Sequence, residues 1–188
     1  MSPQTKRLML KRRILEWQTD RKIKRRKAFS GFNRLHSVAL LGLLTDKTEL
    51  KSLLTFLKKV NRAGVNADFY AFFPGNKKAY LDQFPDSDFP IISRSDINWF
   101  GLPKGEEVNA LFEKEYDLLF NADLRSDEVV HYLAAGCPAR FKLGFDLERA
   151  EIYDFMVELP EKANLIDALE QSNMALRNVF GKELLPAN

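Results

Sequence analysis

Two expected strand ends carry the polar side chains whose types could do chemistry. Thr45 and Asp46 follow the first strand expected in the chain, and Asn121, Asp123 and Arg125 follow a later one. In an open parallel sheet, ligands bind beyond the carboxyl ends of the strands. A carboxylate beside a guanidinium there could bind a polar substrate or orient a base, or it could form an ordinary loop salt bridge. These five residues are the candidates for a ligand pocket.

The turn after the first strand lacks the glycines of a nucleotide site. A dinucleotide site needs GxGxxG and a P-loop needs GxxxxGK[ST], but residues 42–48 read GLLTDKT. Asp46 would also repel a phosphate, so the turn either caps the next helix or contacts another ligand. We expect no cofactor and no metal, because the chain has one cysteine and no HExxH or CxxC motif. Cys137 is expected to be buried, and His131 to be a partly exposed helix residue.

The N-terminus carries the strongest charge pattern. Residues 1–30 hold 11 Lys and Arg against two acids, whereas the whole chain has a net charge of only +3. This asymmetry indicates either an anionic partner, such as RNA, a ribosome or a membrane surface, or docking onto the acidic body or a second subunit. The candidate contacts are Lys11, Arg12, Arg13, Arg21, Lys22, Lys24, Arg25, Arg26 and Lys27.

A Gly- and Pro-bounded connection carries a second interaction signal. Trp99 and Phe100 are adjacent in the stretch DINWFGLP. Two neighbouring aromatic side chains either pack against the body or remain exposed, and an exposed pair would mark a docking surface.

The elements that position these residues alternate between helix and strand, which predicts a three-layer, Rossmann-like α/β fold with a mostly parallel sheet of five to six strands. Apolar runs such as 37–44 (SVALLGLL) are typical of strands buried on both faces. The expected strands are 37–44, 67–73, 90–93, 116–121, 139–145 and 153–159. The expected helices are 5–28, 48–63, 78–84, 106–114, one from the cap Ser126 to Gly136, and 165–180 capped by Asn164.

The first of these helices is expected to use Leu10, Ile14 and Trp17 as its apolar side, with Leu8 and Leu15 widening it, and its second half is expected to stand in solvent. Ser30 and Gly31 then separate a basic helical arm, 1–30, from a single α/β domain, 31–188. No apolar segment approaches the length of a membrane span, and Lys11 to Arg13 interrupt any signal-peptide core. We therefore expect a cytoplasmic protein.

Residues 115–146 (EYDLLFNADLRSDEVVHYLAAGCPARFKLGFD) resemble a stretch in the N-terminal half of heptosyltransferase-type enzymes of the glycosyltransferase-B fold. Residues 37–160 are also similar to an uncharacterised bacterial domain family. The resemblance implies a Rossmann-like fold. It does not imply a complete transferase, because those enzymes have a glycine-containing first turn and a second half that binds the donor.

Two hypotheses follow. In the first, the protein is a non-catalytic interaction module whose basic helix contacts an anionic partner or another subunit, so that deletion of residues 1–30 abolishes the interaction and leaves the fold intact. In the alternative, it is a small enzyme or ligand-binding protein of glycosyltransferase-like ancestry, with a polar pocket at the strand ends. The sequence leaves open whether the protein is an enzyme.

Overall fold

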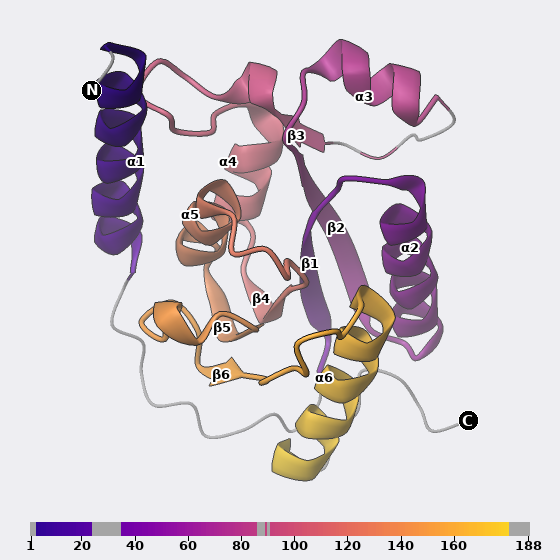
Figure 1. Cartoon of the computed structure of the whole chain (residues 1–188). Coiled ribbons are helices and arrows are strands. Elements are labelled where there is room, and N and C mark those ends of the chain that lie inside the picture. The colour runs from indigo at the N-terminus through magenta and orange to yellow at the C-terminus, as the bar shows by residue number, and fades with distance from the viewer. Residues whose placement is uncertain (1–2, 24–34, 86–88, 90, 181–188) are drawn as a thin grey trace.

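The computed structural model describes residues 3–23, 35–85, 89 and 91–180 (Figure 1). Its helices are α1 Pro3–Lys22, α2 Lys47–Arg62, α3 Lys77–Gln83, α4 Glu106–Glu113, α5 Glu128–Gly136 and α6 Leu165–Phe180. Its strands are β1 Ser37–Leu43, β2 Asn66–Phe73, β3 Ile91–Ser93, β4 Tyr116–Asn121, β5 Ala139–Gly144 and β6 Phe155–Met156, and short 3-10 turns lie at Arg94–Asp96 and Leu147–Arg149.

The six strands form one parallel sheet in the order β3-β2-β1-β4-β5-β6. This confirms the expected Rossmann-like α/β fold. The strand order reverses between β1 and β4, and at such a reversal the loops beyond the strand ends diverge and leave a crevice.

Two cores cover the two faces of the sheet. Val38 and Leu40 of β1 pack with α2 and α6, whereas Ala39 and Leu41 pack with α4 and α5. Successive side chains of a strand point to opposite faces, so a strand covered on both sides needs an unbroken apolar run. Residues 37–44 supply that run.

Three helix starts test the expected caps. Asp46 caps α2 through its bonds to the Thr48 and Glu49 amides, and Asn164 caps α6 in the same way. The expected cap at Ser126 is wrong, because Asp127 accepts from the first amides of α5 instead. Ser126 adopts a positive φ of 54° in the turn before that helix.

The expected strand over 153–159 is much shorter in the structure. Only Phe155 and Met156 pair with β5. At the start of β6, the Asp154 side chain accepts from the Lys142 amide at 2.8 Å, and at its end the Val157 amide donates to the carbonyl of Gly144, the last residue of β5. The ladder is therefore limited to two residues.

Helix α1 packs against α5 as an additional layer, as Figure 1 shows for the indigo helix. Its buried side chains are Leu15 and Thr19, and the Thr19 hydroxyl is satisfied by Leu15 O at 2.8 Å. The expected apolar side is therefore right at Leu15 and wrong at Leu10 and Trp17, which are 60% and 54% exposed.

Polar contacts fix this rotation of the helix. Arg12 pairs with Glu128 at 3.1 Å, and the Lys22 ammonium lies 4.1 Å from the centre of the Phe112 ring. Ile23 packs against the core on the α5 side, so the second half of the helix does not stand free in solvent. The expected boundary at residue 30 lies outside the described residues.

A pair of leucine substitutions on α1 tests this orientation. Leu15→Ala should lower the free energy of unfolding by about 2–3 kcal/mol, because it removes buried apolar contacts with α5. Leu10→Ala, the matched change on the exposed side, should change it by less than about 0.5 kcal/mol. Urea denaturation of both variants measures the difference, and the reverse ranking would show that the helix docks through Leu10.

Candidate functional site

The carboxyl ends of β1 and β4 are joined by one carboxylate, that of Glu49 in the first turn of α2. Its Oε2 accepts hydrogen bonds from Thr45 N at 3.1 Å and from Thr45 Oγ1 at 2.8 Å, and its Oε1 pairs with the Arg125 guanidinium. Gln83 Nε2 also donates to Thr45 O at 2.8 Å. Glu49 was not among the residues predicted from the sequence, although the spacing Asp46-x-x-Glu49 is the capping-box pattern and could have identified it.

Asp46 is used by the backbone of α2. Its Oδ1 accepts from Thr48 N at 2.7 Å and from Glu49 N at 2.9 Å. These bonds satisfy two of the amides that a helix leaves unpaired at its start. Of the two interpretations of this turn, the structure thus supports helix capping by Asp46.

Asn121 and Asp123 hold the loop after β4. Asp123 is buried, and its two carboxylate oxygens accept from Arg125 N at 2.9 Å and Asp127 N at 2.7 Å. Burial raises the pKa of Asp123, and the two amide bonds oppose that rise. Because the Arg125 side chain pairs with Glu49, the adjacent carboxylate and guanidinium do not form a pair with each other.

A buried polar chain lies beside this loop. Asn121 Nδ2 donates to Tyr153 Oη at 2.5 Å, Tyr153 Oη lies 3.1 Å from His131 Nδ1, and His131 Nε2 lies 3.0 Å from Asp146 Oδ2. These distances fit donation from Tyr153 to His131 and from His131 to Asp146. Burial raises the pKa of the Tyr153 phenol, which keeps its proton available for this donation.

The expectation that His131 is partly exposed is wrong, since it is only 2% exposed. The cause is that α5 is covered by the sheet on one side and by α1 on the other. The sequence held one sign of this burial: His131 lies one turn into a helix that begins at the carboxyl edge of the sheet. Asp146, which follows β5, lies at the same edge.

Asp146 is the charged end of the chain. Burial alone would raise its pKa, but hydrogen bonds from the Ser126 side chain and the Glu148 amide, together with His131, hold the pKa below its usual value. Ser126 itself has a positive φ of 54°.

The polar groups at the strand ends, including the chain from Asn121 to Asp146, are held by hydrogen bonds within the protein. An Asp-His-Tyr chain is able to relay a proton in principle, but His131 and Tyr153 are both buried, and the other polar groups bond to one another. No group of three His, Cys, Asp or Glu side chains within the described ranges is placed to hold a metal ion. Cys137 is buried, as expected.

The exposed side of α1 presents cations together with aromatic rings. Arg21 lies 4.7 Å from the centre of the Trp17 ring, and Arg7 lies 3.7 Å from that of Trp99. Lys11 is also near Trp99, at 5.5 Å. Such contacts orient a guanidinium without neutralising its charge.

The remaining predicted cations fall into three groups. Arg13 is exposed, whereas Arg12 and Lys22 are held by Glu128 and by the rings of α4 and α5. Four predicted contacts lie outside the described residues: Lys24, Arg25, Arg26 and Lys27.

The Trp99–Phe100 turn is exposed and well defined. Asn98 Oδ1 accepts from the Phe100 amide at 2.9 Å and from the Leu102 amide at 3.1 Å. Gly101 has a φ of 89°, and a side chain there would lie 3.5 Å from the α1 backbone at Lys11. The turn therefore presents its two rings beside the N-terminal half of α1, where Trp99 is 66% and Phe100 is 56% exposed.

Exposed apolar side chains concentrate at this junction. Six of the ten large hydrophobic residues that are exposed in the described chain belong to α1 or to the turn beside it, so this side is distinct from the rest of the surface. We call this area the α1–Trp99 surface. Its residues are Lys6, Leu8, Met9, Leu10, Arg13, Trp17, Trp99 and Phe100.

The buried chain generates a prediction about pH. Because the pKa of Asp146 is lowered by folding, its charged form stabilises the protein above the usual carboxyl pKa, and that contribution is lost as the pH falls through the lowered value. Asp146→Asn should cost about 1–3 kcal/mol at pH 7, and its deficit should shrink below a pH of about 4. Urea denaturation at pH 7 and below pH 4 measures the loss of stability, with Asp82→Asn at an exposed position as the control. A loss that is the same at both pH values would contradict the stabilising role of the Asp146 carboxylate.

A comparison with curated protein sequences finds no match. Among solved structures, the E. coli heptosyltransferase WaaC with ADP is similar, with a TM-score of 0.46 and 15% sequence identity over 80% of this chain and 49% of that chain. The present chain thus spans about half the length of the transferase chain. Residues 11–172 match the model of a protein family, and the chain therefore belongs to the "Family of unknown function (DUF6913)".

Proposed function

We propose that this protein binds peripherally to an anionic membrane surface through the α1–Trp99 surface. One observation carries the proposal: cations and large apolar side chains are exposed together along α1 and on the turn beside it. Exposed cations are attracted to anionic headgroups, and exposed apolar side chains gain free energy when they are buried at the acyl boundary.

Docking of α1 on α5 supports the proposal because it fixes the orientation of the contacts. Leu10, Arg13 and Trp17 are separated by three and four residues, so they share one side of the helix. That side lies opposite Leu15, which is buried against the body. The binding side is thus already formed, and association with a surface would not have to order it.

Aliphatic side chains favour a lipid partner over RNA. Trp17 and Trp99 beside arginines would also suit stacked bases. Leu8, Met9 and Leu10, however, are each at least half exposed. Burial of such side chains contributes to membrane binding, whereas recognition of a phosphate backbone does not require them.

The same geometry favours a binding role over the enzyme alternative. At the strand ends, the Asp46 and Asp123 carboxylates accept from backbone amides, and the Thr45 and Arg125 side chains bond to Glu49. None of the described helices is long and apolar enough to cross a membrane. We place the protein at the cytoplasmic face of a membrane, where anionic lipids attract basic surfaces. The proposal needs no catalytic residue.

Vesicle binding tests the proposal. Full-length protein should cosediment with vesicles of phosphatidylglycerol and phosphatidylcholine, and not with phosphatidylcholine alone. Each cation near such a surface contributes about 1 kcal/mol, so Lys6→Gln combined with Arg13→Gln should weaken binding by roughly 30-fold. Leu10→Gln should also weaken binding, because it removes an apolar group that enters the interface.

Leu81→Gln is the matched control, since Leu81 is similarly exposed but lies on α3. It should bind like the wild type. Absence of vesicle binding, with nucleic acid that copurifies and is released by salt, would instead assign the surface to RNA.

A further inference from the structure

The N-terminal half of β2 forms an open edge of the sheet. β3 pairs only with Ala71 to Phe73, although β2 begins at Asn66. Within the described residues, no strand covers 67–70 on this side. The β2–β3 ladder is thus shorter than β2 itself. The unpaired part of a strand edge can serve as a template for another strand.

Along β2, the backbone N–H and C=O groups of successive residues point alternately toward β1 and toward the open edge. Asn66 N donates to His36 O on the β1 side, so the groups of Ala67 and Phe69 point away from β1. The Ala67 amide donates to Asn61 Oδ1 at 2.9 Å. The Phe69 amide and the Ala67 and Phe69 carbonyls remain without a strand partner among the described residues.

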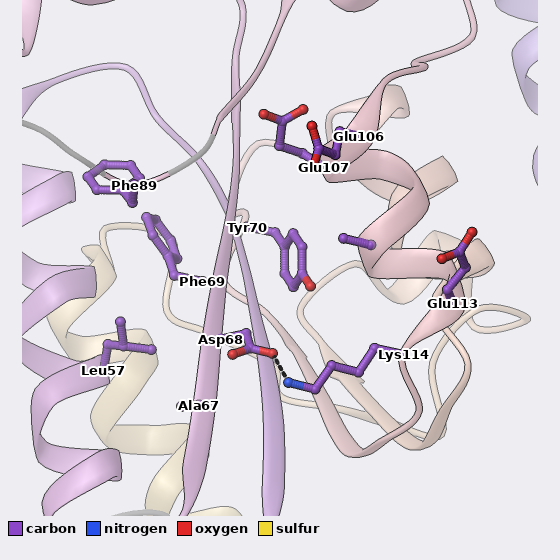
Figure 2. A pocket seen from close by; sticks show the side chains of 11 residues that line it. Leu57, Ala67, Asp68, Phe69, Tyr70, Phe89, Glu106, Glu107, Glu113 and Lys114 are labelled. Carbon is purple, nitrogen blue, oxygen red and sulfur yellow. Dashed lines mark hydrogen bonds and ion pairs between the residues drawn. The ribbon is translucent and has the colours of Figure 1, made fainter.

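A cavity of about 930 Å³ follows this edge (Figure 2). Its two walls lie on opposite faces of the sheet and differ in chemistry. On the α2 side, Leu57, Phe69 and Phe89 make an apolar wall, with the two phenylalanine rings 5.1 Å apart. On the other side, α4 supplies Glu106 and Glu107 at its start and Glu113 at its end.

The α4 wall carries unbalanced negative charge. Lys114 is the one cation that lines the cavity, and it pairs with Asp68, which also accepts from Tyr116 Oη at 2.6 Å. No cation from the described ranges pairs with Glu106, Glu107 or Glu113. The cavity therefore complements a positively charged occupant on one side and an apolar occupant on the other.

We propose that this groove binds an extended cationic peptide of a partner protein as an added strand beside β2. Side chains of a strand alternate between the two faces of a sheet. Along such a peptide, every second side chain would face the carboxylates of α4, and those between would face the apolar wall at Leu57, Phe69 and Phe89. The groove thus selects a sequence in which Lys or Arg alternates with apolar residues, by main-chain bonding and side-chain pockets together.

A labelled synthetic peptide tests the inference with the full-length protein. The probe alternates Lys and Val over about ten residues, long enough for one strand, and the control peptide has the same composition in two blocks. Fluorescence anisotropy should show that the alternating peptide binds and that the blocked one binds at least about tenfold more weakly. Hydrogen exchange should show protection of the Phe69 amide in the complex.

Two matched triple variants locate the charge contribution. Glu106→Gln, Glu107→Gln and Glu113→Gln together should weaken peptide binding by about tenfold, since each carboxylate contributes only as an exposed ion pair does. Glu148→Gln, Glu158→Gln and Glu161→Gln make the same charge change elsewhere and should leave binding unchanged.

Three results would overturn the inference. The first is absence of binding at about 1 mM peptide. The second is that the alternating and the blocked peptide bind equally well and that the two triple variants bind them equally well. The third is concentration-dependent dimerisation that protects the Phe69 amide without peptide, which would make a second copy of the chain the occupant. Vesicle binding is measured separately, so failure of either proposal leaves the other standing.

Discussion

The structure depends on covering α5 from two sides. Six consecutive residues of this helix, 130–135, are buried. Since consecutive residues point all around a helix, one face of a sheet cannot bury them, and a helix that is apolar all around needs neighbours on every side. The sheet covers one side, and α1 together with α4 covers the rest, so α1 is a layer of the fold in addition to being a carrier of charge.

The docking of α1 on α5 also determines which side chains of α1 are exposed to solvent. The side that docks uses Leu15, Thr19 and the stems of longer side chains. Most of the other apolar and basic residues are left outward, next to the turn that carries Trp99 and Phe100. On the same helix α5, His131 is buried and bonds to Tyr153 and Asp146. Helix α5 thus contributes to the polar chain at the strand ends and also supports the helix that presents the α1–Trp99 surface.

Local sequence signals predicted much of the fold. Apolar runs identified β1 and β4, and the amphipathic pattern of 48–63 with Asp46 before it identified α2, because these signals act within a few residues. The short β6 could not be predicted, since its length depends on where β5 ends.

The candidate site was predicted only in part. The cations of α1 and the Trp99–Phe100 pair were recognisable from residue type. Their orientation was not, because the spacing placed the centre of the apolar side at Leu10, Ile14 and Trp17 and placed Leu15 only at its margin. The choice between them depends on Glu128 and the rings of Phe112 and Tyr132, which are far away in sequence. The open edge of β2 likewise depends on how little of it β3 covers.

Native-state hydrogen exchange of the full-length protein tests the central claim most directly. If α1 is a layer of the fold, the amides around Leu15 and Thr19 should open with a free energy close to that of the α5 amides at Tyr132 and Leu133, because one cooperative unit opens as a whole. If the α1 amides exchange at the rate of an unfolded chain while those of α5 remain protected, α1 is a detached arm, and the account of both the buried chain and the exposed surface fails.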